Sequence, residues 1–174
     1  MDWKTIYIIE KASLDDLEKI LEILDSVLLH NLPSSDNGFL STNPGAHFYE
    51  ALIKKTNFFY TAYDKNNLVG FLIAYPNNLL RPVDDIQKFL INNYKEEDFI
   101  YVLQIAVSPK YHMKGVGTAL YKKLFEDTKN SKTMVVTSAV PYNKASEQFH
   151  LKLGFKKIGK IMRTDGGSNF LYER

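Results

Sequence analysis

The chain has 174 residues, of which 45% are hydrophobic, 24% are charged and none is Cys. This length predicts a single domain over residues 1–174 with a core that needs no crosslinks, and the lack of Cys excludes disulfides, thiolate zinc sites and a cysteine nucleophile. With 22 basic against 20 acidic residues and no apolar run of membrane-spanning length, we expect a soluble, cytoplasmic protein that binds neither nucleic acid nor membrane.

The first part of the chain carries one strand pattern and two helix patterns. Residues 6–11 are a β-rich run, and leucines at spacings of three and four then predict an amphipathic helix over residues 14–28, with Ser13 as its N-cap. Turn formers dominate residues 33–45, which predicts a long ordered loop of the kind that often carries function. A short helix is expected over residues 47–55.

The remaining elements alternate between strands and helices. Two β-rich runs at residues 58–63 and 68–75 predict a hairpin, and an inserted helix is expected over residues 83–94. After these we expect a strand at 99–107, a helix beginning at Val116, a strand at 133–140, a helix at 145–153 and a terminal hairpin of strands 156–162 and 169–172. The order β-α-α-β-β-α-β-α-β-α-β-β predicts an α/β domain around a mixed sheet.

The most informative stretch is a strand that runs into a glycine-containing turn before a helix. Gly115-Val116-Gly117 opens that helix, whose first turn leaves backbone N–H groups unpaired and carries partial positive charge. Glycine lets an anion approach the backbone, and Lys114 adds a cation beside it. This combination favours a bound phosphate, with a purely structural turn as the alternative. Neither the P-loop nor the dinucleotide glycine pattern is present, since Leu120 stands where the third glycine would be.

A second informative stretch lies in the expected helix near the C-terminus. Asn143 is a candidate N-cap, and Gly154 follows the last turn as a C-terminal stop. Phe149 and Leu153 share one face of this helix, which predicts that the face packs against the core. His150 lies on the same helix, and a lone histidine in such a place is more often a core residue than a reactive one.

Together the two stretches resemble the GNAT (Gcn5-related N-acetyltransferase) superfamily. The acetyl-CoA motif of that family, Gln/Arg-x-x-Gly-x-Gly/Ala, corresponds to His-Met-Lys-Gly-Val-Gly at residues 112–117, and its later motif corresponds to Asn143, Ser146, Phe149-His150 and Gly154-Phe155. At motif level the resemblance covers residues 99–160. It implies a single-domain GNAT fold: a mixed, mostly antiparallel, twisted sheet of about seven strands, with helices on both faces and a splay between strands four and five.

The resemblance implies acetyl-CoA as the acyl donor and no metal. The pantetheine arm would lie in the splay against the backbone of Ile105, Ala106 and Val107, and Asn143 would reach the cofactor from the opposite wall. His112 would mainly shape the turn, and its side chain is also a candidate contact of the phosphates. The diphosphate would bind backbone N–H groups of Met113, Lys114, Gly115, Val116, Gly117 and Thr118. On this basis we expect Gly117→Glu to abolish acetyl-CoA binding.

The implied reaction is direct attack of a primary amine, in a small molecule, an amino-acid derivative or a protein, on the thioester. Many family members have a proton-donating Tyr at the position of His150, so His150 is the candidate acid and Tyr142 is a second candidate. Gln104 cannot serve as the base that family members often supply on strand four, and we name none. We expect the acceptor site to form from residues 31–42, residues 77–83 and the region of Tyr142.

Two classes of function stay open at this point. The first is an N-acetyltransferase that uses acetyl-CoA. The second is a CoA-binding or acyl-CoA-binding sensor or scaffold with little activity, which the histidine in the acid position and the missing base favour. A nucleotide-binding regulatory domain is disfavoured because the chain has no phosphate loop for ATP or NAD. A homodimer is a further expectation, since family members often dimerise.

Overall fold

The chain adopts the predicted order of elements in a computed structural model that describes residues 7–174; Ile6, the first residue of the predicted N-terminal strand, lies outside the described part. The helices are α1 (Leu17–Ser26), α2 (Ala46–Lys55), α3 (Asp85–Asn93), α4 (Val116–Asp127) and α5 (Lys144–Lys152). The strands are β1 (Ile8–Lys11), β2 (Phe58–Asp64), β3 (Asn67–Pro76), β4 (Ile100–Val107), β5 (Thr133–Val140), β6 (Lys156–Met162) and β7 (Ser168–Glu173).

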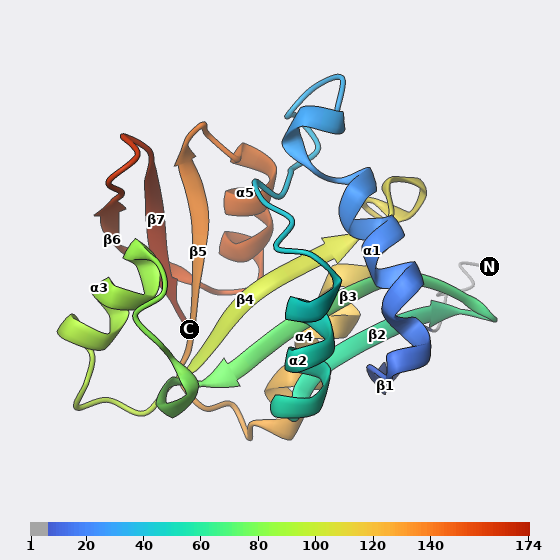
Figure 1. Cartoon of the computed structure of the whole chain (residues 1–174), viewed down its shortest axis with the longest axis horizontal. Coiled ribbons are helices and arrows are strands. Elements are labelled where there is room, and N and C mark those ends of the chain that lie inside the picture. The colour runs from blue at the N-terminus through green and yellow to red at the C-terminus, as the bar shows by residue number, and fades with distance from the viewer. Residues whose placement is uncertain (1–6) are drawn as a thin grey trace.

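All seven strands form one sheet, in the order β1-β2-β3-β4-β5-β7-β6 (Figure 1). The pair β4–β5 is parallel and the other five pairs are antiparallel. The parallel pair needs a crossover connection, and α4 supplies it. The predicted α/β architecture with a mixed, mostly antiparallel sheet is therefore confirmed.

Helices cover both faces of the sheet. On one face α4 packs against β2, β3 and β4, where Leu120, Tyr121 and Leu124 are fully buried. On the other face α1 and α2 cover one half of the sheet and α3 the other half, as Figure 1 shows. Strand β3 lies between these layers, and burial on both faces explains its nearly continuous apolar sequence from Val69 to Tyr75.

Strands β4 and β5 pair only at their first residues and then diverge. Ile100–Val102 is in register with Thr133–Val135, and beyond Val102 neither strand pairs with the other. A β-bulge accompanies this divergence, because the β3–β4 register jumps from Gln104 to Val102 and leaves Leu103 without a partner. The splay that the resemblance implied is present, and residues 103–107 of β4 expose a free backbone edge toward it.

Two helices differ from their predicted bounds for local reasons. The predicted helix over residues 14–28 begins with a short 3₁₀ turn and ends at Ser26, after which the chain turns to meet the long loop. There the N–H of Leu40 donates to the carbonyl of Val27, and the N–H of Leu29 donates back to Leu40. Helix α3 starts later than expected, because Asp84 is its N-cap and accepts a hydrogen bond from the N–H of Gln87.

Candidate active site

The free edge of β4 forms one wall of the candidate site. Leu103, Gln104 and Ile105 are partly exposed there, in contrast to the buried first half of the strand. In an extended strand, alternate residues direct both N–H and C=O toward the same edge, so this wall offers backbone donors and acceptors to an extended ligand. Gln104 accepts a hydrogen bond through Oε1 from the hydroxyl of Tyr49 in α2 (2.9 Å), which holds its side chain toward α2.

Side-chain hydrogen bonds hold the turn between β4 and α4 in place. The imidazole Nε2 of His112 donates to the carbonyl of Val107 (2.8 Å), so the ring ties the turn back to the end of β4. The hydroxyl of Tyr7 donates to the carbonyl of Lys114 (3.0 Å), and the hydroxyl of Tyr111 donates to Asp64 (3.0 Å). These contacts hold the turn through its carbonyls and side chains and engage none of its N–H groups.

Five backbone N–H groups at the start of α4 have no hydrogen-bond acceptor among the described residues: those of Met113, Gly115, Val116, Gly117 and Thr118. The N–H of Lys114 is the exception, since it donates to the carbonyl of Tyr111 (3.3 Å). A cluster of unpaired donors at the positive end of a helix is an anion site. Five of the six N–H groups predicted to face the diphosphate are therefore available for it.

The two glycines of the turn serve different purposes. Gly115 has φ +87°, a left-handed conformation that a side chain disfavours, and open space where its Cβ would be. Gly117 is helical, but a Cβ there would lie 2.8 Å from Cζ of Phe149 in α5. The absence of a side chain at Gly117 is thus explained by the packing of α4 against α5. Gly117→Glu would disturb this packing as well as any bound phosphate, so it does not isolate phosphate binding as we expected.

Asn143 is buried at the start of α5, and both ends of its amide group are engaged within the protein. Its Oδ1 accepts from the N–H of Ser146 (3.2 Å), which caps the helix as predicted. Its Nδ2 donates to the carbonyl of Phe39 (2.8 Å), in the long loop before α2. Asn143 therefore connects the loop of residues 33–45 to the helix that packs on the first turn of α4, a contact that the sequence did not indicate.

His150 lies in an aromatic part of the core with 1% of its surface exposed. Its Nδ1 faces the carbonyl of Ser146 (2.7 Å) and therefore carries the proton, so Nε2 accepts from the hydroxyl of Tyr121 (2.7 Å). Burial lowers the pKa of the imidazole to about 4, which makes the ring neutral at pH 7. Neither nitrogen holds a proton that is free to leave, and the geometry favours the structural interpretation of this residue.

Tyr142, the second candidate acid, is 49% exposed and lies two residues beyond the end of β5. Its hydroxyl donates to the carboxylate of Glu147, a buried residue of α5 that also accepts from the hydroxyl of Tyr172 (2.7 Å) and pairs with Lys157. The hydrogen bond to Glu147 raises the pKa of Tyr142, and the three donors lower the pKa of Glu147 to about 2. The proton of Tyr142 is thus directed at Glu147.

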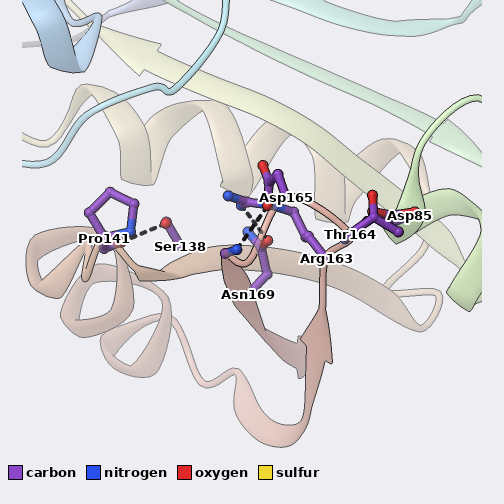
Figure 2. Close-up of polar contacts among 8 residues, drawn as sticks. Asp85, Ser138, Pro141, Arg163, Thr164, Asp165 and Asn169 are labelled. Carbon is purple, nitrogen blue, oxygen red and sulfur yellow. Dashed lines mark hydrogen bonds and ion pairs between the residues drawn. The ribbon is translucent and has the colours of Figure 1, made fainter.

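A polar row lies on the opposite wall, at the splayed end of β5 (Figure 2). Ser138 pairs in register with Asn169 of β7, and both lie on the sheet face that carries α3. Asn169 Oδ1 accepts from Nη1 of Arg163 (2.9 Å), and the backbone N–H and hydroxyl of Thr164 both donate to Asp85 of α3 (2.8 Å each). Helix α3 thus holds the β6–β7 turn beside the splay. No local sequence pattern predicts this contact.

Comparison with known proteins now identifies the family. The model of the acetyltransferase (GNAT) family matches residues 22–155, so the chain belongs to this family, as the resemblance implied. It is similar in structure to the ribosomal-protein-S18-alanine N-acetyltransferase of Escherichia coli (15% identity, TM-score 0.63, covering 97% of this chain and 92% of that one). A comparison with curated protein sequences finds no match.

Two further solved structures have the same fold. Ard1 from Thermoplasma volcanium aligns with 16% identity and a TM-score of 0.69, over 97% of this chain and 96% of that one. Arabidopsis thaliana Naa50, in complex with the bisubstrate analogue CoA-Ac-MVNAL, aligns with 15% identity and a TM-score of 0.65, over 97% of each chain. Within residues 7–174 no helix is both long and apolar enough to cross a membrane, and no three His, Cys, Asp or Glu side chains gather as a metal site.

Proposed function

We propose that the chain is an acetyl-CoA-dependent N-acetyltransferase that acetylates a primary amine by direct attack of the amine on the thioester. The observation that carries this proposal is the position of five unpaired N–H groups at the start of α4, at the end of the free edge of β4. A diphosphate on those donors would direct the rest of the cofactor along residues 103–107. The Naa50 complex, in which a GNAT-like fold holds a CoA bisubstrate analogue, supports the same ligand class.

The proposed reaction needs few side chains. The amine nitrogen attacks the thioester carbonyl carbon, the N–C bond forms, and the C–S bond breaks to release the CoA thiolate. Backbone N–H groups on the free edge of β4 would polarise the carbonyl and stabilise the oxyanion, as preorganised donors do in acyl transfer. The protein would therefore act mainly by holding the thioester and the amine together and excluding water.

Two protons must move in this reaction, one from the amine and one to the thiolate. Gln104 is an amide and cannot accept the first, so we propose that the amine loses its proton to water. The candidates for the second are His150 and Tyr142, as the resemblance suggested. The low pKa of His150 makes its protonated form scarce at pH 7, and Tyr142 already donates to Glu147. We therefore propose that water protonates the thiolate.

The second candidate function is a CoA-binding sensor or scaffold with little activity. The specific observation that favours it is the neutral, fully hydrogen-bonded state of His150 in the position where many family members have a proton-donating Tyr. The two candidates make the same prediction for CoA binding and opposite predictions for turnover.

Calorimetric titration with acetyl-CoA, CoA and ATP tests the binding site first. We expect both CoA species to bind and ATP not to bind. Thr118→Glu places a carboxylate on the exposed first turn of α4, where it suits the helix dipole but competes with a phosphate, so it should keep the fold and weaken CoA binding. Lys122→Gln, one turn further along, lowers the net charge equally and serves as the control. Equal affinities for the two variants would contradict the proposed site.

Release of free thiol from acetyl-CoA with a panel of amines then separates the two functions. Amine-dependent release supports the transferase. Binding of acetyl-CoA without turnover of any amine favours the sensor. Absence of CoA binding by the folded protein would contradict both.

A further inference from the structure

A small cavity lies between the inserted α3 segment and α2, and its lining includes none of the residues of the β4–α4 turn. Leu79, Arg81 and Val83 of its lining come from the 77–83 segment, where we expected part of the acceptor site. Its volume is about 150 Å³. Apolar cavities of roughly this size are large enough to bind a benzene molecule. The apolar part of the lining comes from α2, the end of β3 and the start of the inserted segment, through Phe48, Leu52, Tyr75, Leu79 and Val83.

The polar side chains of the lining are those of Tyr75, Thr56, Gln87, Lys55 and Arg81. The hydroxyl of Thr56 donates to the carbonyl of Ala74 (2.6 Å) and accepts from the N–H of Phe58 (3.2 Å), so it is not free for a ligand. Tyr75 is 5% exposed, and its hydroxyl has no hydrogen-bond partner among the described residues. Burial, reinforced by the nearby Asp84, raises the pKa of this phenol, so the hydroxyl keeps its proton and remains a donor. Lys55 and Arg81 are exposed, and neither forms a salt bridge with a described residue. Nη1 of Arg81 donates to the carbonyls of Asn78 (3.1 Å) and Leu80 (2.7 Å), which leaves its other guanidinium nitrogens as donors.

Asp84 lies near Tyr75 but forms no salt bridge with Lys55 or Arg81 among the described residues. Its two carboxylate oxygens accept from the backbone N–H and the side-chain amide of Gln87, where they cap α3. The carbonyl oxygen of the Gln87 amide accepts in turn from the N–H of Arg81 (3.1 Å), which leaves the side chain of Gln87 without a free polar end. The free polar groups at the cavity are therefore all hydrogen-bond donors.

An apolar pocket with donors and cations at its mouth is complementary to a compact apolar anion. We propose that this cavity is a second ligand site, which binds a small carboxylate whose apolar part is about the size of a phenyl ring. The ring occupies the space between Leu52 and Leu79, and the carboxylate meets Lys55 and the hydroxyl of Tyr75. Phenyl-ring carboxylates are the simplest members of this class.

Calorimetric and NMR titrations with benzoate, benzamide and acetate test the proposal on the full chain without any acyl donor. Benzamide keeps the ring and removes the charge, whereas acetate keeps the charge and removes the ring. We expect benzoate to bind with a dissociation constant of about 1 mM or lower and the other two to bind at least about tenfold more weakly. The largest NMR shifts should fall on Leu52, Tyr75 and Leu79.

Substitutions at exposed positions should leave the fold intact, so their effects report on ligand binding alone. Lys55→Gln should weaken benzoate binding about fivefold, whereas Lys54→Gln, the adjacent lysine that pairs with Glu50 and does not line the cavity, should leave it unchanged. Val83 is 74% exposed, so Val83→Asp should weaken binding by repulsion and Val83→Ser should weaken it less. Equal binding of benzoate and benzamide, shifts centred on residues 113–118, or equal effects of Lys54→Gln and Lys55→Gln would overturn the proposal.

Discussion

The hydroxyl of Tyr121 in α4 donates a hydrogen bond to Nε2 of His150 in α5, at 2.7 Å and out of contact with solvent. This contact joins α4, which begins within the first motif of the site, to α5, which carries most of the second. The ring of Phe149 packs beside both residues, with centroid distances of 5.9 Å to Tyr121 and 5.3 Å to His150. His150 thus stabilises the packing of α5 against α4 as a neutral polar residue.

The buried state of His150 makes stability depend on pH. Its pKa is about 4 in the folded protein and 6.5 when exposed, so the unfolded chain binds the proton more readily. Its contribution is therefore complete above about pH 6.5 and is lost as the pH falls toward 4, by about 3 kcal/mol at pH 4. We expect urea unfolding of the wild type to show this loss and His150→Gln to lack it. A His150 NMR titration with a midpoint near 6.5 would contradict this account.

Glu147 makes the stability of the fold depend on pH over a lower range than His150 does. Its pKa is about 2 against 4.5 in the unfolded chain, first because of Lys157 and then because of Tyr142 and Tyr172. The folded carboxylate holds its proton less readily, so its contribution is complete above about pH 4.5 and is lost as the pH falls toward 2. We expect Glu147→Gln to destabilise the protein by about 2 kcal/mol at pH 7, since Lys157 is partly exposed and screened.

An exposed ion pair provides the control for Glu147. Glu126 pairs with Lys122 at 3.9 Å, and the Glu126 side chain is 59% exposed. Glu126→Gln should change the free energy of unfolding by less than about 0.5 kcal/mol. If both variants unfold alike at pH 7 and at pH 4, the buried position of Glu147 has no energetic consequence.

The fold and part of the site follow from local sequence patterns. Hydrophobic periodicity predicts the helices and strands because each has to bury one or both faces. The glycines at 115 and 117 predict the anion site, since backbone donors at a helix start need no distant partner. The splay depends on pairing between strands and was expected only from the family resemblance.

Local sequence patterns could not predict the tertiary contacts that determine the roles of single side chains. The partner of Asn143 is the carbonyl of Phe39, 104 positions away, and the partner of His150 is Tyr121, 29 positions away. Only the folded chain brings these pairs together. Any residue can supply a backbone carbonyl, so the sequence does not reveal which residue will be such a partner. The resemblance therefore placed His150 in a reactive position, whereas its tertiary contacts favour a neutral core histidine.

The glycines of the β4–α4 turn should respond differently to alanine. Gly115→Ala puts a side chain on a left-handed residue, which should cost about 1–2 kcal/mol and weaken CoA binding by changing the turn. Gly117→Ala would gain helix propensity but brings its Cβ against Phe149. Shortening Phe149 should relieve this contact, so Gly117→Ala and Phe149→Leu together should destabilise less than the sum of their separate effects. Additive free energies from urea unfolding would show that Gly117 has no packing role.

The side-chain amide of Asn143 makes two hydrogen bonds, one that caps α5 and one that holds the loop before α2. Two substitutions can separate their effects. Asn143→Ser keeps a hydroxyl that can cap α5 but is too short to reach the carbonyl of Phe39, whereas Asn143→Ala loses both contacts. Both variants should therefore free the loop of residues 33–45 from α5, and Asn143→Ala should be less stable than Asn143→Ser by about 1 kcal/mol, the usual value of a cap.

Amide hydrogen exchange measures the two tasks separately. Exchange at Gly38 and Leu40, on either side of the Phe39 carbonyl, should accelerate in both variants, whereas exchange at Ser146 should accelerate further in Asn143→Ala. The hydrogen bond from Leu40 to Val27 stays intact in both variants, so the acceleration should be partial. Unchanged exchange at these loop positions in Asn143→Ser would mean that Val27 alone holds the loop. In that case the contact between Asn143 and Phe39 would not connect the loop to the helix that packs on the anion site.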